Sequence, residues 1–285
     1  MQKQLATFSK LTIVPTIAML ALASCTPAKP SLDTQGGSQL TIQLKPTKEH
    51  PVITPLDLEA VQKVIENRTN GLGIPEAMIQ SANGNKILVQ LPGVRDPQQA
   101  ERVLGDNARL EFREQKAGAE GQLVVEMHML NEAKANQVIF KKSQNQQSIA
   151  TNQVAIEKQY TEIGKLFGKA VITGKQLKSA YPEPSSFAES WSILIEFDRA
   201  GGDAFAQLTK KLAGTGRSIG VFIDNAPVST PTVGVEFAQT GITGGKAVIS
   251  GNFTAENAND LAIQLRSGAL PVPIEIIESR KIIPK

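Results

Sequence analysis

The segment Leu40-Thr41-Ile42-Gln43-Leu44 opens the folded part of the chain with apolar side chains at alternate positions. This alternation is typical of a β-strand that buries one face. A helix is predicted next, because Thr54-Pro55-Leu56-Asp57 supplies a capping hydroxyl, a proline at the first helical position and an acid in the first turn. Asn70-Gly71 ends this helix. Its apolar positions follow at helical spacing: Leu58, Val61, Ile65 and Leu72.

Two further strands and a second helix follow. Residues 77–80 and 86–91 read as strands joined at Asn83-Gly84-Asn85, which is a hairpin signal. Asp96-Pro97 begins a short helix, and residues 109–113 alternate as a fourth strand. The predicted order is therefore β-α-β-β-α-β, a ferredoxin-like unit.

The composition changes to Gln, Asn and Lys over residues 121–167. Two stretches there carry apolar side chains at spacings of three and four, separated by polar residues 143–148: Val124, Met127 and Leu130, then Ile156, Tyr160, Ile163 and Phe167. We predict a helical hairpin that projects from the body. A solvated, partly disordered insertion remains the alternative, because the apolar content is low.

After Trp191 the chain resembles its own beginning in element order. Strands are predicted at 192–197, 219–223, 228–235 and 246–250, with one helix ending at Gly214 and another running from Thr254 to Gly268. Residues 271–277 close as a strand. We expect that strand to return to the first sheet, so the middle of the chain is an inserted domain. The predicted class is α+β with antiparallel sheets.

The single cysteine, Cys25, follows Leu22-Ala23-Ser24 at the end of an apolar run. Lys3 and Lys10 give a positive start, and a helix over residues 11–22 would rise only about 18 Å, too short for a bilayer core of roughly 30 Å. This order is typical of a bacterial lipoprotein signal, so we expect cleavage before Cys25 and lipid attachment to it. An incidental cysteine or an uncleaved anchor are the alternatives.

Composition excludes several classes of function. The formal net charge of +3 is close to neutral, which argues against nucleic acid as a partner. With one cysteine, no disulfide can form within the chain. His50 and His128 lie far apart, and each lacks further ligands at metal-binding spacing, so we interpret both as surface residues.

No motif predicts catalysis or a cofactor. There is no Gly-x-Ser-x-Gly elbow, and the glycine clusters at 71–73, 214–220 and 241–247 miss the spacing of nucleotide-binding loops, so we interpret them as turns. Glu111 with Glu114 and Glu256 with Asp260 are interpreted as solvated charges. We therefore expect no enzyme activity, no cofactor and no metal.

Four separated motifs resemble a known family. In chain order they are residues 32–37 (Leu-Asp-Thr-Gln-Gly-Gly), 91–96 (Leu-Pro-Gly-Val-Arg-Asp), 215–221 (Thr-Gly-Arg-Ser-Ile-Gly-Val) and 243–254, which begins Thr-Gly-Gly and ends Ile-Ser-Gly-Asn-Phe-Thr. They resemble the large first periplasmic domain of SecD, a membrane subunit that assists Sec-dependent protein export. Residues 261–273 resemble the family's approach to its second membrane helix. Ser31, Thr34 and Gln35 depart from the first motif, which usually reads Gly-Leu-Asp-Leu-Arg-Gly-Gly.

The resemblance implies a ferredoxin-like base with an inserted head that holds the emerging polypeptide and swings relative to the base. We expect a signal peptide at 1–24, a lipidated tether at 25–37, a base at 38–115 and 270–283, and a head at 116–269 with its helical insertion at about 121–168. The chain reaches Lys285 before any of the family's membrane helices, so we expect it to act without a proton-driven motor of its own.

The partners implied are translocating or unfolded polypeptides, Sec membrane subunits, and a membrane reached through a lipid anchor on its outer, periplasmic-side face. The polypeptide-binding residues stay unassigned, although the head strands 219–223 and 228–235 are the first place to look. Core packing is the alternative explanation of their apolar residues. A scaffold that docks on Sec components and binds no client is the second hypothesis, and an enzyme is the third.

Overall fold

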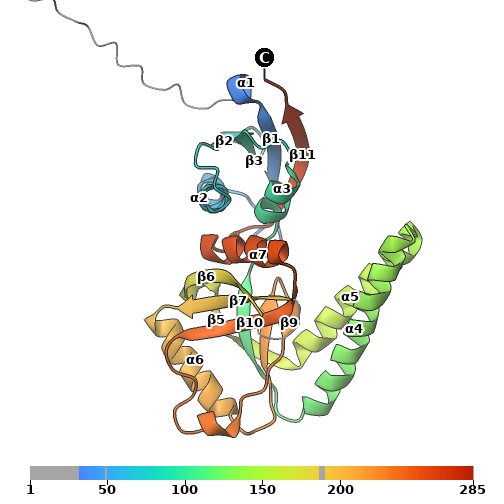
Figure 1. Cartoon of the computed structure of the whole chain (residues 1–285), viewed down its shortest axis with the longest axis vertical. Helices are drawn as coiled ribbons and strands as arrows, with labels where there is room; N and C mark the ends of the chain where they lie inside the picture. The colour runs from blue at the N-terminus through green and yellow to red at the C-terminus, as the bar shows by residue number, and fades with distance from the viewer. Residues whose placement is uncertain (1–31, 49, 186–189, 285) are drawn as a thin grey trace, which may run out of the picture.

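The computed structural model describes residues 32–48, 50–185 and 190–284. The predicted signal peptide, Cys25 and the first part of the predicted tether lie outside these residues. The described elements form two domains that lie end to end, called here the base and the head (Figure 1). Among these elements, no helix combines the length and the apolar character needed to cross a membrane.

The base consists of α1 (Leu32–Gln35), β1 (Gly37–Leu44), α2 (Pro55–Gly71), β2 (Met78–Ala82), β3 (Lys86–Pro92), α3 (Gln98–Gly105) and β11 (Ile274–Ile282). Its four strands form an antiparallel sheet in the order β11-β1-β3-β2. The expected return of the closing strand to the first sheet is therefore confirmed. Helix α1 was not expected, because residues 32–35 fell within the predicted tether; the side chain of Leu32 is buried.

Helix α2 forms for the local reasons visible in the sequence. Thr54 accepts a hydrogen bond from the Asp57 backbone N–H, and the Asp57 carboxylate accepts one from the Thr54 N–H, which makes a complete capping box. Val61 and Ile65 then face the sheet and are fully buried. They pack against Ile42, whose strand alternates between buried and partly exposed positions.

The head consists of β4 (Leu110–Gln115), α4 (Glu120–Lys142), α5 (Gln146–Lys165), β5 (Phe167–Thr173), a short 3₁₀ turn (Gly174–Gln176), β6 (Leu177–Pro184), β7 (Trp191–Phe197), α6 (Arg199–Leu212), β8 (Ile219–Ile223), β9 (Ala226–Ser229), a second 3₁₀ turn (Val235–Phe237), β10 (Lys246–Phe253) and α7 (Ala255–Ser267). It contains two sheets, ordered β5-β4-β8-β9 and β10-β7-β6. Both sheets, α6 and α7 enclose one apolar core.

Strand β4 was assigned to the wrong sheet. The sequence predicted residues 109–113 as the fourth strand of the base, but β4 pairs with β5 and β8 in the head. The reason is packing, because Phe112 lies edge-on to Phe197 and Phe205 in the head core. The strand predicted at 228–235 is also too long, since β9 ends at Ser229 and residues 235–237 form a 3₁₀ turn.

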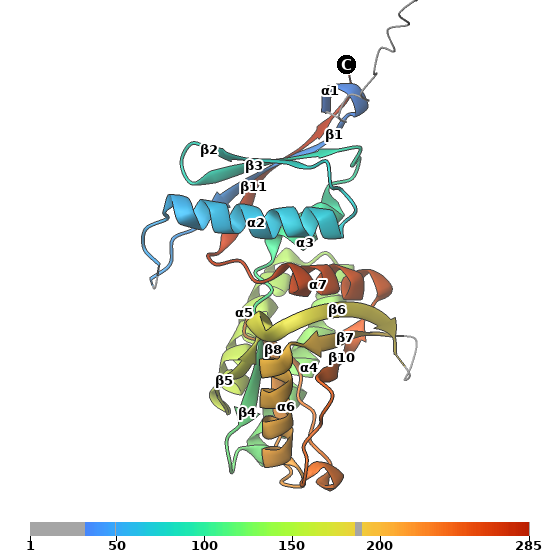
Figure 2. The ribbon, with the colours of Figure 1, turned by 90° about the vertical axis from the view of Figure 1, so that its left-hand side faces the viewer.

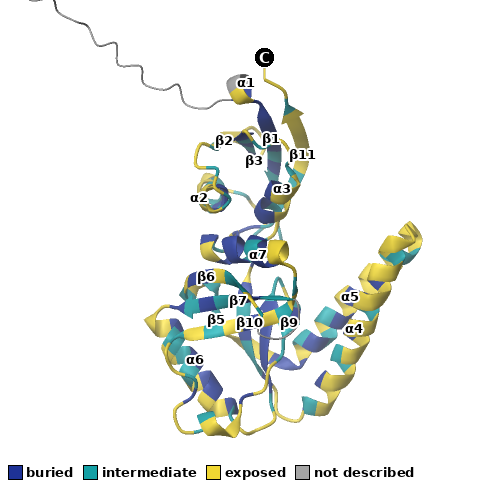
Figure 3. Cartoon of the chain, in the orientation of Figure 1, coloured by how far each residue is buried: buried dark blue, intermediate teal, exposed yellow. Residues whose placement is uncertain are grey.

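The helical hairpin is confirmed as α4 and α5, which project from the head (Figure 1). Its root rests on the outer face of β8, where Phe222 packs edge-on against Phe167. Leu123, Leu130 and Gln137 face α5, whereas Val124 is 71% exposed, so the predicted inward position of Val124 is wrong by one residue. Figure 3 shows much of the hairpin surface as exposed.

Helix α7 lies at the boundary between the domains. It packs on β6 and β7 of the head and on α2 and α3 of the base (Figure 2). Asp260 on α7 is only 5% exposed and accepts hydrogen bonds from Gln99 and from Nε of Arg102, both at 3.0 Å. The prediction of a solvated Glu256–Asp260 pair is therefore wrong for Asp260, because the base covers it.

Candidate functional site

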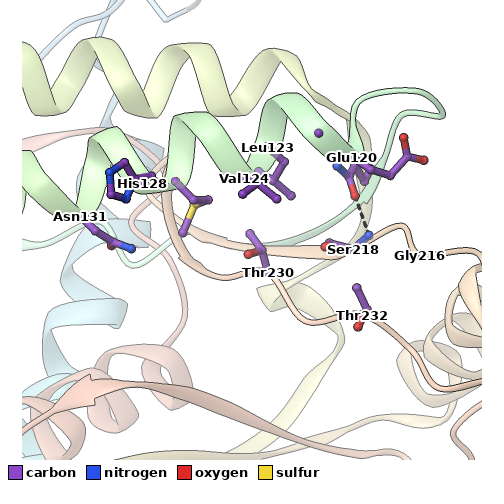
Figure 4. A pocket seen from close by; sticks show the side chains of 12 residues that line it. Glu120, Leu123, Val124, His128, Asn131, Gly216, Ser218, Thr230 and Thr232 are labelled. Carbon is purple, nitrogen blue, oxygen red and sulfur yellow. Dashed lines mark hydrogen bonds between the residues drawn. The ribbon is translucent and has the colours of Figure 1, made fainter.

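A pocket of about 630 Å³ lies in the head, between the first turns of α4 and the chain that surrounds β9 (Figure 4). Its walls come from four separate parts of the sequence: the end of β4, the α4 face from Glu120 to Asn131, residues 216–218 and residues 230–232. Pockets with an apolar wall and a few convergent polar groups are the usual form of a ligand site.

One wall is apolar and comes from α4. Leu123, Val124 and Met127 lie at spacings that bring them to one side of the helix. Leu123 is anchored in the hairpin root with 5% exposure, whereas Val124 stands in solvent. This wall can therefore accept an apolar side chain from outside without rearrangement of the core.

The opposite wall carries hydroxyl groups. Ser218, Thr230 and Thr232 line it, and their hydroxyls make no hydrogen bond within the described residues. Ser218 and Thr232 form an isolated antiparallel bridge, and the Ile219 N–H donates to the Pro231 carbonyl at 2.8 Å. β9 is the last strand of its sheet, so this wall lies at a sheet edge.

Gln115 closes the inner end of β4 beside the pocket. It is fully buried, and its Oε1 accepts a hydrogen bond from the Ser218 N–H at 2.7 Å, drawn as the dashed line in Figure 4. The Nε2 of the same amide is buried and has no hydrogen-bond partner among the described residues. A buried donor without a partner costs free energy, on the order of 1–3 kcal/mol, so an acceptor supplied by a ligand would be favoured there.

The pocket is nearly uncharged. Glu120 is the one carboxylate among its lining residues, and no lysine or arginine lines it. His128 also lines it, and its ring lies 3.5 Å from the Glu132 carboxylate in solvent. This composition suits an uncharged ligand and disfavours an acidic one.

The fold brings only some of the residues named in the sequence analysis to the pocket. Strand β8 is central in its sheet and its residues Ile219, Val221 and Phe222 are buried, so core packing explains them. His128 reaches the pocket, whereas His50 pairs with Asp57 in the base, 2.9 Å away. Thr230 and Thr232 belong to the segment 228–235 that the sequence analysis named as a first place to look, and both line the pocket. Gln115 was missed, because nothing in the local sequence shows that the end of β4 meets this segment.

Comparisons with known proteins match both domains. The family model "SecDF, P1 head subdomain" matches residues 139–272, and the model "Protein translocase subunit SecDF, P1 domain, N-terminal" matches residues 58–117. The chain is 48% identical to the protein translocase subunit SecD of Synechocystis over 260 residues, which are 90% of this chain and 55% of that protein. It is 35% identical to SecD of Prochlorococcus marinus, over 96% of this chain and 61% of that protein.

Solved structures agree with this match. A crystal structure of SecDF in a super-membrane-facing form aligns with a TM-score of 0.64 at 27% identity, covering 89% of this chain and 31% of that one. A second structure, titled "Structure and function of a membrane component SecDF that enhances protein export", aligns with a TM-score of 0.58 at 26% identity over 84% of this chain and 98% of that one. The chain spans about half the length of the curated SecD relatives it matches.

Proposed function

Because this chain carries the P1 domain of the SecD and SecDF family, we propose that it binds translocating or newly exported polypeptides and assists Sec-dependent protein export. The observation that carries the proposal is the head pocket, which sets an apolar helix face opposite a sheet edge rich in hydroxyls. An extended chain presents side chains and main-chain groups in alternation, so such a pocket can hold many sequences weakly.

Photo-crosslinking tests client binding. A photoreactive residue at Val124, inside the pocket, should capture exported polypeptides in cells. Val154 on α5 is the matched control. It is a valine that is 67% exposed, against 71% for Val124, and it does not line the pocket. Capture of clients at neither position, nor at other exposed head positions, would remove the proposal.

A scaffold that docks on Sec membrane components is the second candidate. The α4–α5 hairpin favours it, since Val138 and Ile139 are more than half exposed on a projecting arm. Affinity purification from membranes separates the two functions. A scaffold should retain Sec subunits in stoichiometric amounts, whereas a client-binding protein should retain many exported proteins.

Anchoring through a lipid on Cys25 is part of the proposal. Several acyl chains on one cysteine give stable attachment, since each buried methylene contributes about 0.8 kcal/mol. Cys25→Ala should therefore abolish labelling by a radioactive or alkyne fatty acid and leave an unprocessed precursor. Unchanged labelling in that variant would show that the lipid is attached at another residue, which contradicts the assignment of Cys25.

A further inference from the structure

We infer that the head pocket binds the main chain of an uncharged, extended polypeptide segment, and that the Gln115 amide donates a hydrogen bond to one of the segment's carbonyl oxygens. This inference rests on the proposed function and adds to it a ligand chemistry and a set of recognising residues. Apolar contact on α4 then selects the side chain, and the nearly neutral lining excludes acidic segments.

The first step of the argument concerns the Gln115 amide. Its Oε1 is committed to the Ser218 N–H, which fixes the orientation of the amide and leaves both Nε2 hydrogens unpaired. Gln115 is fully buried, so this donor is not satisfied by bulk water. A carbonyl oxygen is the acceptor that every polypeptide offers at every residue.

The second step concerns the edge of the sheet. Thr230 and Thr232 follow β9, which pairs with β8 alone and is the last strand of its sheet among the described elements. Extended peptides add to such edges by main-chain hydrogen bonds, with alternate side chains pointing to either face. Pro227 and Pro231 lie in the same segment, and prolines limit how far pairing along an edge can extend. We therefore expect a short contact of a few residues, and weak binding.

The third step concerns charge. A ligand aspartate or glutamate would lie beside Glu120 with no cation on the lining to offset it. Like charges that face each other across an interface disfavour binding. A neutral segment avoids this penalty.

The test uses the full chain and three fluorescent ten-residue peptides with blocked ends. The neutral peptide contains only Val, Thr, Ala and Ser. In the second peptide three of these residues are replaced by Asp, and in the third the same three are replaced by Lys. Fluorescence anisotropy should give the weakest binding for the Asp peptide. Val124→Lys should weaken binding of the neutral peptide about tenfold, and Val125→Lys should leave it unchanged, because Val125 is exposed on the same helix but does not line the pocket.

Gln115→Glu tests the donor itself. The variant keeps an acceptor oxygen for the Ser218 N–H and removes the amide hydrogens, so we expect about a tenfold loss of affinity. Thr230→Val is a milder variant that keeps the shape of a partly exposed side chain and should weaken binding two- to fivefold.

The outcomes separate this inference from the proposed function. Equal effects of the two valine variants, or equal binding of the Asp and neutral peptides, would overturn the inference while client binding stands. If none of the three peptides binds and crosslinking at Val124 is also silent, the proposed function itself fails.

Discussion

Replacing Arg68 with methionine should lower the free energy of unfolding of the base by about 3–5 kcal/mol. Arg68 belongs to α2 and is fully buried. Its guanidinium donates to five backbone carbonyls, at distances from 2.5 to 3.3 Å: those of Val103, Leu104, Asp106, Asn107 and Gly268. Methionine fills most of the volume but donates nothing, so carbonyls that are buried together would lose their donor.

These carbonyls lie where the chain passes between the two domains. Asp106 and Asn107 follow α3 on the way to the head, and Gly268 follows α7 on the way back. Arg68 therefore joins the outgoing and returning segments, as does the hydrogen bond from the Leu270 N–H to the Asn107 carbonyl. We expect the loss in Arg68→Met to include a looser connection between base and head.

The charge of Arg68 is tolerated because carbonyl dipoles surround it. Burial lowers the pKa of Arg68 to about 10, and the negative charges of Asp106 and Asp224 oppose that shift. The guanidinium thus stays protonated at neutral pH. The carbonyls of Val103 and Leu104 belong to the last turn of α3, where the helix dipole favours a cation.

Hydrogen exchange of the β1 and β3 amides under increasing denaturant measures the stability of the base, and fluorescence of Trp191 reports on the head. Lys63→Met is the matched control, since Lys63 lies on the exposed side of α2 and pairs with Glu66. Lys63→Met should lower the free energy of unfolding by less than about 0.5 kcal/mol. If Arg68→Met is no more damaging than Lys63→Met, the carbonyl cluster does not stabilise the base as argued.

Local signals predicted most of the individual elements, and the reason is visible in particular residues. The capping box at Thr54 and Asp57 fixes the start of α2, and Gly84 and Asn85 adopt the positive φ angles that their hairpin turn requires. Strands β5 and β6 were not predicted. β5 exposes four consecutive residues and β6 contains Pro182 and Pro184, so neither shows the alternation of a half-buried strand.

The return of β11 to the first sheet was predicted, but other features that depend on contacts between distant segments were not visible in the sequence. The alternation of residues 110–115 predicts a strand correctly but says nothing about which sheet it joins. Asp260 looks like the polar flank of an amphipathic helix, yet α7 is covered on both sides by the two domains. The pocket likewise joins residues 115–131 to residues 216–232, and only the tertiary fold brings them together.

Substitution of Gly37 by alanine should destabilise the base by about 2–4 kcal/mol. Gly37 begins β1, the strand held between β3 and β11, and its φ angle of 145° is one that side chains rarely allow. A Cβ atom there would lie 2.2 Å from the Leu91 carbonyl oxygen and 2.8 Å from Cδ2 of Leu32. The methyl group can be accommodated only if β1 and β3 separate at this end, which breaks hydrogen bonds of the ladder.

Gly84→Ala separates the collision from the strain of an unusual φ angle. Gly84 also has a positive φ, 75°, but nothing lies within 4 Å of the position its Cβ would take, so only the conformational cost of about 1–2 kcal/mol applies. Chemical denaturation of both variants, followed by circular dichroism, measures the difference. Because Gly37 ends the Leu32–Gly37 motif, a larger loss at Gly37 explains that glycine by packing between strands. Equal losses would mean that β1 and β3 yield easily, and that the close contact at Leu91 does not constrain this position.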